Sequence, residues 1–195
     1  LGNTTLNRDG NWGFFLAKVN STGSWEWALK GGHIPDYTWA GIDVDSNGNP
    51  FVTSNFRGTA YFGNTTIISS SGGQDIFVAK ASSSGAWLWA IRAGNVSTDG
   101  GTGIAVDSSG DAYVTGVYMG NVDFGPTSLS SSINAEIFVA KVSNNGSWLW
   151  AINIRGGGNN LGRAIAVDSN GDALVVGTFY SSVNFPNGGY GSSGL

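Results

Sequence analysis

The run Asp-x-Asp-x-Asn-Gly, at Asp43, Asp45, Asn47 and Gly48, has the residue types of the first half of a calcium loop. Carboxylate and amide oxygens at alternate positions are the ligands that such a loop offers to Ca²⁺. The run lacks the Glu that calcium loops place six residues after the Gly. A hairpin turn whose Asp side chain bonds its own backbone explains the same residues, and we prefer this interpretation to a metal site.

Six tryptophans stand in three pairs, and one residue separates the members of each pair. Residues two apart project to the same face of a β-strand. Such pairs either fill the interfaces between neighbouring sheets or form exposed platforms on which sugar rings stack. Filling is the preferred interpretation, and glycan binding is the alternative, at Trp25, Trp27, Trp87, Trp89, Trp148 and Trp150.

Three lysines recur in the same pattern, at Lys18, Lys80 and Lys141. One interpretation places a lysine opposite an acid such as Asp75, Asp107 or Asp168. A structural ion pair or a surface lysine fits these positions better than a catalytic amine does.

Other catalytic chemistry has few residues to use. His33 is the single histidine, and no Gly-x-Ser-x-Gly nucleophile elbow lies near it. Glu26 and Glu136 are the two glutamates, and most aspartates fall in expected turns, which leaves little for a glycosidase pair. The sequence therefore predicts no enzyme, no catalytic residue and no cofactor.

Five Asn-x-Ser/Thr sequons are candidate glycosylation sites, although this number matches what the abundance of these residues produces by chance. They are Asn3, Asn20, Asn64, Asn95 and Asn145.

The lysines, the tryptophan pairs and several other residues recur with one period. The lysines, the second Trp of each pair, and Phe62, Phe124 and Phe185 are each spaced by 62 and then 61 residues. Asp43, Asp107 and Asp168 are spaced by 64 and 61, which places an insertion in the preceding linker. A fixed period of this length is typical of a repeat fold.

Each repeat contains four expected strands that are joined by Gly-centred turns. The middle repeat reads GIAV at 103–106, then a strand around 113–115, a third at 137–141 and a Trp-rich fourth at 148–152. The turns Asn47-Gly48 and Asn170-Gly171 predict two-residue hairpins. Four antiparallel strands make one propeller blade, and Gly and Ala in the first strand suit the crowded centre of such a fold. The predicted fold class is all-β, with propeller-type blades.

The runs GIAVDSSGDAYVTG, VDFG at 122–125 and EIFVAKVSNNGSWLW resemble the SBBP (β-propeller) repeats of bacterial and archaeal surface and secreted proteins. The resemblance covers all three repeats. It implies a propeller fold and an extracellular or cell-surface location, and that family has no shared catalytic residues to carry over.

The blade pattern is out of phase with the chain. Residues 1–36 hold only the third and fourth strands of a blade, 37–98 and 99–158 are whole blades, and 159–195 hold only a first and a second strand. Three blades are too few to close one ring, so each half-blade is expected to leave an unpaired edge.

The complementary half-blade of a second copy would fit each open edge. Two copies would close a six-bladed ring, or many copies would add head to tail into a filament. The alternative is that the chain is a fragment of a larger surface propeller. The expected subunit-interface residues are Phe14, Phe15, Leu16, Val19, Ala173, Leu174, Val175 and Val176.

Composition narrows the partners further. Charged residues make up 11% of the chain, Cys is absent, and the net charge is −4 without a basic stripe, so a nucleic-acid partner is not expected. No apolar run reaches the roughly 20 residues that a membrane span needs. The predicted function is therefore a non-enzymatic extracellular structural protein that assembles with itself, and a glycan-binding propeller is the alternative.

Overall fold

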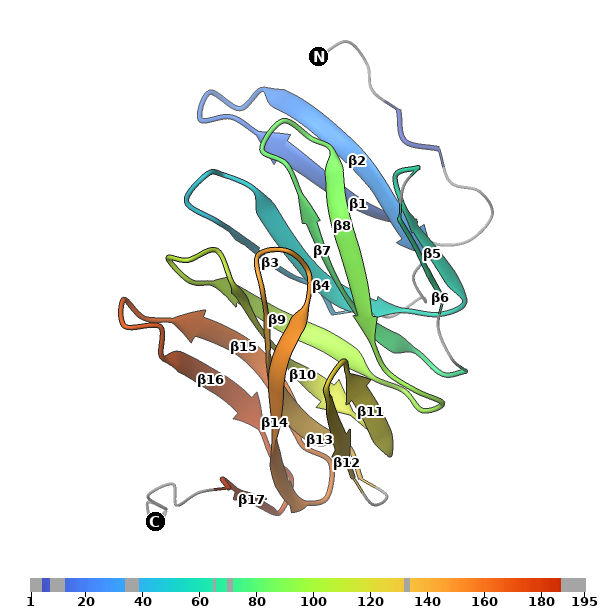
Figure 1. Cartoon of the computed structure of the whole chain (residues 1–195), viewed down its shortest axis with the longest axis vertical. Helices are drawn as coiled ribbons and strands as arrows, with labels where there is room; N and C mark the ends of the chain where they lie inside the picture. The colour runs from blue at the N-terminus through green and yellow to red at the C-terminus, as the bar shows by residue number, and fades with distance from the viewer. Residues whose placement is uncertain are drawn as a thin grey trace.

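The computed structural model describes residues 5–7, 13–33, 39–64, 66–69, 72–131 and 134–186. These residues form β-strands, turns and loops, and none of them belongs to a helix that could cross a membrane. The strand pairs among them are antiparallel, and the sheets stack in succession along the long axis of the molecule (Figure 1). The predicted all-β fold class is confirmed.

Two sheets each contain four strands in the order of a propeller blade, and the second has a short fifth strand at its edge. The first contains β3 (Gly41–Val44), β4 (Pro50–Phe56), β7 (Asp75–Ala81) and β8 (Trp87–Ala93). The second contains β9 (Gly100–Val106), β10 (Ala112–Tyr118), β13 (Glu136–Val142) and β14 (Trp148–Gly157). We call these two sheets the first and second blades.

A half-blade lies at each end of the stack. β1 (Gly13–Val19) and β2 (Trp25–His33) occupy the repeat positions of a third and a fourth blade strand. β15 (Leu161–Val167) and β16 (Ala173–Thr178) occupy those of a first and a second strand. The two pairs lie at opposite ends of the molecule (Figure 1).

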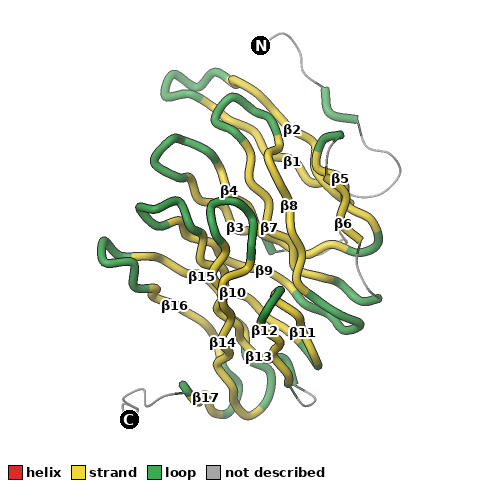
Figure 2. The backbone as a smooth tube through the Cα atoms, viewed as in Figure 1, coloured by secondary structure: helices red, strands yellow, loops and turns green. Residues whose placement is uncertain are grey.

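Short strands lie in the segments that connect the second and third blade strands. The sequence did not predict which strands they pair with. They are β5 (Thr59–Phe62), β6 (Thr66–Ser69), β11 (Asn121–Phe124), β12 (Thr127–Ser130) and β17 (Ser182–Asn184). β5 pairs with β2, and β17 pairs with β14, so each of these two strands extends the preceding sheet. They are visible as small hairpins or extensions beside the main strands (Figure 2). β5 and β17 therefore tie their repeats to the one before, whereas β11 and β12 pair with each other.

The hydrophobic core lies between successive sheets. One cluster joins the two blades through side chains such as Phe51, Ile76, Val114 and Phe138. A second cluster joins the N-terminal half-blade to the first blade, and a third joins the second blade to β15 and β16. Each of the two blades therefore buries apolar side chains against a neighbour on both faces.

The turn between the first and second strands differs in length from the prediction. The Asp45 backbone N–H donates to Asn49 O at 3.0 Å, and the Gly48 N–H donates to Asp45 O at 2.9 Å. This closes a three-residue loop rather than the predicted two-residue one. Gly48 takes the left-handed conformation there, with φ of 75°, which fits the three-residue hairpin with Gly in that place.

The first strands of successive sheets approach one another closely. A Cβ built on Gly41 would lie 2.9 Å from Gly103 Cα, and a Cβ on Gly103 would lie 2.9 Å from Ala164 Cα. Backbone atoms cannot give way at that distance, so the separation requires Gly at the first two positions. This confirms the crowded centre that the Gly and Ala residues predicted.

We expect Gly103→Ala to lower the free energy of unfolding by about 1–3 kcal/mol, the usual cost of overpacking. The added methyl group forces β9 and β15 apart. Urea denaturation measures the loss, and Gly13→Ala is the matched control because a Cβ there has nothing within 4 Å. Equal stability of the two variants would contradict the close approach.

Candidate functional site: two open blade edges

An Asp fixes each turn between first and second strands. Oδ1 of Asp45 accepts from the backbone N–H groups of Asn47 and Asn49, each at 2.9 Å. Asp107 and Asp168 bond the equivalent two N–H groups of their own turns at 2.8 to 3.0 Å. The hairpin-turn interpretation is confirmed, and Asp45 is the counterpart of Asp107 and Asp168.

The alignment of Asp43 with Asp107 and Asp168 is therefore wrong. Asp45 restores spacings of 62 and 61 residues, so the linker carries no insertion of two residues. The error arose because Asp43 and Asp45 both flank a single Val and are two residues apart. Asp43 instead reaches the second blade, where its Oδ2 accepts from the Val106 N–H at 2.7 Å.

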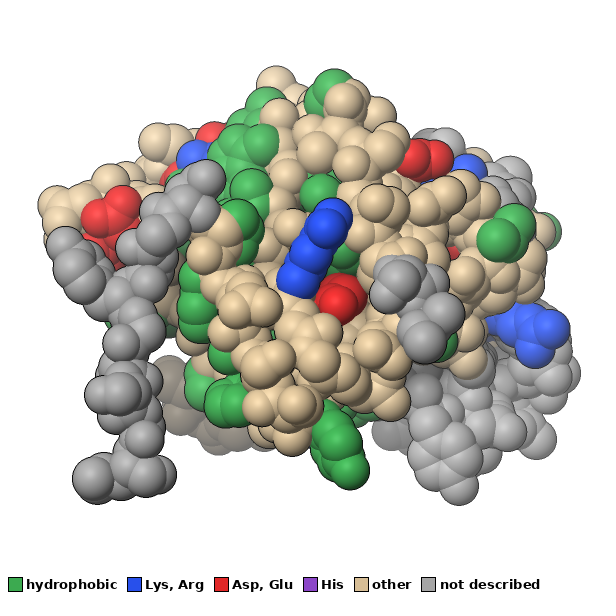
Figure 3. Space-filling view, turned by 90° about the horizontal axis from the view of Figure 1, so that it is seen from below, with side chains coloured by type: hydrophobic (Ala, Val, Ile, Leu, Met, Phe, Trp, Pro, Cys, Tyr) green, Lys and Arg blue, Asp and Glu red, His purple; other side chains and the backbone are tan. Residues whose placement is uncertain are grey.

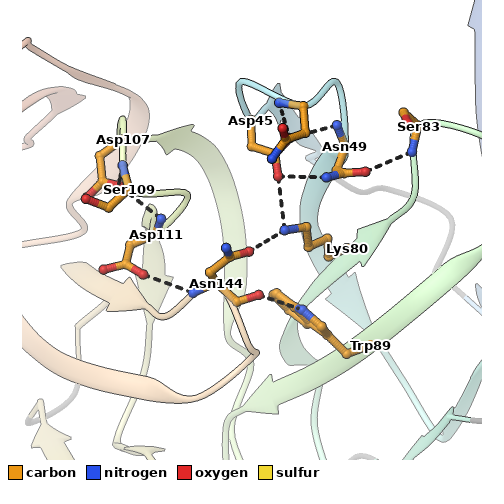
Figure 4. A network of polar contacts seen from close by, with 10 residues as sticks. Asp45, Asn49, Lys80, Ser83, Trp89, Asp107, Ser109, Asp111 and Asn144 are labelled. Carbon is orange, nitrogen blue, oxygen red and sulfur yellow. Dashed lines mark hydrogen bonds and ion pairs between the residues drawn. The ribbon is translucent and has the colours of Figure 1, made fainter.

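Two of the three recurring lysines pair with these turn aspartates, whereas Lys18 pairs with Glu26. Lys80 Nζ lies 3.0 Å from Asp45 Oδ2, and Lys141 Nζ lies 3.0 Å from Asp107 Oδ2. Asp107, one of the three candidate acids, is thus the partner of Lys141. Asp75 was a candidate partner for a lysine, but its carboxylate pairs with Arg92 at 3.0 Å. Lys80 also contacts the Asn144 side chain of the next blade, which continues the polar network across the seam (Figure 4).

These pairs keep the carboxylates charged. Burial acts to raise the pKa of Asp45, but hydrogen bonds from Asn49, Lys80 and Asn47 outweigh it and lower the pKa to about 2. The pKa of Asp107 is likewise lowered, because bonds from Lys141 and the backbone outweigh its burial. The described residues contain no group of three or more acidic or histidine side chains placed to hold a metal ion. Calcium binding at Asp43, Asp45 and Asn47 stays an untested alternative to the turn.

Four tryptophans bridge successive sheets by donating from the indole Nε1. Trp27 donates to Ser83 O, and Trp89 donates to Asn144 O, each at 3.0 Å and each toward the following blade. Trp87 donates to Lys30 O and Trp148 to Arg92 O, each at 2.9 Å and each toward the preceding sheet. The interface-filling interpretation is confirmed for these four residues.

Trp25 and Trp150 belong to the same two series but lie at the open ends. Trp25 is exposed, and Trp150 is half-buried against the Tyr113 ring. Neither indole has a bridging acceptor among the residues that the structure describes. Glycan stacking at the six tryptophans stays a prediction.

β16, the second strand of the C-terminal half-blade, is exposed, although the equivalent strands of the two blades are buried. Every residue of β4 and of β10 is buried, whereas β16 has one half-buried residue and is otherwise exposed. Among the predicted interface residues, Ala173, Leu174 and Val176 are exposed and Val175 is half-buried toward β13. Figure 3 looks at the molecule from this end, where hydrophobic side chains gather in a band.

The third strand of the N-terminal half-blade shows the same contrast. β7 is buried throughout and β13 nearly so, whereas β1 buries a single residue, Leu16. Phe15 and Val19 are exposed, and Phe14 is half-buried against Phe77 and Trp87. Of the predicted interface residues here, Phe15 and Val19 are thus accessible, while Leu16 already belongs to the core.

A buried carboxyl group escaped the sequence reasoning. Asp99 is fully buried between the two blades, where its Oδ1 accepts from the Met119 N–H at 3.0 Å. Burial raises the pKa of Asp99 to about 7, and the charge of Asp75 acts in the same direction. The repeat could have revealed this position, because Asn160, another polar residue, lies 61 residues later at the same repeat position.

The remaining predicted positions have varied surroundings. The Asn20 side chain caps its own turn, accepting from the Thr22 and Ser24 N–H groups, whereas Asn145 is exposed. Asn64 is exposed, and Asn95 is half-buried. Asn3 lies outside the described residues. His33 ends β2.

Fold and site together define a propeller-like β-repeat protein in which, among the residues that the structure describes, β1 and β16 each pair with another strand on one side only. No family model matches the sequence, so the SBBP family itself is not established. The chain is similar to an uncharacterized WD repeat-containing protein of Acanthamoeba polyphaga mimivirus, with 27% identity over 75% of this chain. The match spans 12% of that relative's length. WD repeats are units of propeller blades, which agrees with the fold.

Proposed function

We propose that this protein is a non-enzymatic structural protein of the SBBP type that acts outside the cell, where copies assemble by completing one another's blades. β16 of one copy pairs with β1 of the next, and the four strands β15, β16, β1 and β2 form one blade. Repetition of this junction gives a closed ring or a filament.

The observation that carries the proposal is the exposure of β1 and β16, whose repeat equivalents are buried. An edge strand with unpaired backbone groups and apolar side chains favours the addition of another strand. Leu174 and Val176 on β16, and Phe15 and Val19 on β1, supply apolar surface whose burial stabilises the junction.

The blades of the chain itself supply the register. Phe51 pairs with Lys80 and Thr53 with Val78 between β4 and β7, and β10 and β13 pair in the same way. The repeat equivalents give Leu174 opposite Lys18, and Val176 opposite Leu16 of the second copy. In this register, the side chains of β16 and β1 alternate between the two faces of the blade as those of β4 and β7 do.

Light scattering after gel filtration tests the assembly. We expect the wild-type chain to elute well above 20.1 kDa, with a size that falls on dilution. Val176→Asp is expected to weaken association at least roughly tenfold, because it would bury an unpaired charge at the position of Thr53 and Thr115. Its fold should persist, since Val176 is exposed in the single chain.

Leu88→Glu is the matched control. Leu88 is exposed on the fourth strand of the first blade, and the equivalent residue of the preceding repeat is Glu26. This variant should assemble like the wild-type protein. A wild-type chain that stays monomeric at every soluble concentration would refute the proposal and favour completion of the edges by further repeats of a longer chain.

A further inference from the structure

Three aromatic side chains meet in each seam that the chain completes by itself. Phe62 on β5 lies 5.1 Å from the ring of Phe77 on β7 and 5.0 Å from that of Trp87 on β8. One repeat later, Phe124 lies 5.0 Å from Phe138 and 4.9 Å from Trp148. The four phenylalanines are fully buried. We call each group of three an aromatic triad.

The third triad is divided between the two ends of the molecule. Its members by repeat position are Phe185, Phe15 and Trp25. Their side chains are 57%, 66% and 61% exposed, respectively. Phe15 and Trp25 come from β1 and β2, whereas Phe185 directly follows β17 at the opposite end (Figure 1).

We infer that Phe185 of one copy and Phe15 and Trp25 of the next form the third aromatic triad, which makes the junction a head-to-tail contact of fixed register. This inference rests on the proposed function, because it names the residues that join the two copies. Ring contacts of this kind add to the stabilisation that burial of the aromatic surface provides.

The register that forms the third triad also brings opposite charges together, one from each end of the chain. Lys80 and Lys141 pair with the turn aspartates Asp45 and Asp107 of their own blades. In the completed blade, Lys18 of the second copy meets Asp168 of the first. Lys18 now pairs with Glu26 at 2.8 Å, with both side chains substantially exposed, and Asp168 is exposed.

Hydrogen bonds from a backbone N–H of one turn to a side chain of another turn repeat in the same way. The side chain of Asn49 accepts from the Ser83 N–H, and that of Asp111 accepts from the Asn144 N–H, each at 2.9 Å. The third pair by repeat position is Asp172 with Ser21 of the second copy. Ser21 is exposed in the single chain.

The indole series reaches the same turn. Trp27 and Trp89 donate to Ser83 O and Asn144 O of the following blade. Trp150 is the third member, and the equivalent acceptor is Ser21 O of the second copy. Aromatic, ionic and hydrogen-bonding groups therefore all indicate one docking geometry.

The junction differs from the internal seams at one point. Gly41 and Gly103 let successive first strands approach, but the strand that would face Gly41 of the second copy carries Ala164. Its methyl group requires a slightly wider separation there. The rotation between copies is thus not a strict repeat of the rotation between blades.

A double-mutant cycle tests the triad. We expect Phe185→Ala and Trp25→Ala each to weaken association by roughly thirtyfold, as at an interface hot spot. The two residues touch in the same junction, so the double variant should lose less than the product of the two single effects. Tyr61→Ala, which removes another exposed aromatic ring, is the control and should assemble normally.

Charge reversal tests the polarity of the contact. Lys18→Asp and Asp168→Lys should each weaken association, because each variant places two like charges in the junction. Mixing the two variants should restore association, because every junction between unlike copies then contains one positive and one negative side chain at positions 18 and 168. Restoration by mixing distinguishes a direct contact from a loss of folding. Assembly that is blocked by Val176→Asp yet unaffected by all four end variants would overturn this inference while leaving the proposed function standing.

Discussion

Phe77→Ala is expected to lower the free energy of unfolding by about 3–5 kcal/mol, the usual cost of removing a fully buried Phe side chain. Phe77 contacts the rings of Phe14, Phe56 and Phe62, with centroids 5.6, 6.3 and 5.1 Å away. These rings belong to different strands on both sides of the seam. The cavity would therefore lie between sheets rather than at a surface that can collapse.

The matched control is Phe15→Ala, which removes the same side chain at the same repeat position of β1. Because Phe15 is exposed in the single chain, we expect a change within about 0.5 kcal/mol. Both variants are compared by urea denaturation in the Val176→Asp background, at a concentration where light scattering shows a monomer, so that assembly does not contribute. Equal losses would mean that the end strands are as buried as the internal ones.

The period of the sequence predicted the repeat and its main strands, because strand positions follow from apolar residues at fixed spacing. Trp27, Trp89 and Trp150 repeat with the same interval as the lysines, and the structure places each on the fourth strand of a sheet. Local patterning was enough here, since each strand and turn carries its own signal.

Pairing between repeats was beyond that reasoning. β5 and β17 are short and pair with strands of the preceding sheet, so their partners depend on contacts far apart in sequence. Phe185 was recognised as a repeat residue, but its role depends on Phe62 and Phe124 meeting a Phe and a Trp from two other strands. Aromatic residues at one spacing do not reveal which of them touch.

The seam between the two blades contains a carboxyl group where the following seam has an amide. Asn160 donates from Nδ2 to Glu136 Oε2 at 3.1 Å, and both residues are buried. Asp99 and Asp75 occupy the equivalent positions one repeat earlier. The backbone hydrogen bonds show the same equivalence, because the Asp99 N–H donates to Gln74 O and the Asn160 N–H donates to Ala135 O. A protonated Asp99 is the closest mimic of the amide.

Stability is therefore expected to fall as the pH rises from about 4 to about 7 and then to level off. Burial, reinforced by Asp75, raises the pKa of Asp99 from 3.8 to about 7 in the folded chain. Between these values the folded state holds a proton that the unfolded state has released, so higher pH favours unfolding. The loss is roughly 4 kcal/mol at most.

Asp99→Asn isolates this effect because the amide does not titrate and already serves at Asn160. We expect the variant to be more stable than the wild-type protein at about pH 8, with a smaller difference at about pH 5, where Asp99 is protonated. Urea denaturation of both proteins at the two pH values gives the difference, again in the Val176→Asp background. Carboxylates such as Asp45, with a pKa of about 2, stay charged across this range. A constant difference between the two proteins would show that Asp99 is ionised throughout, and that the seam tolerates two buried carboxylates.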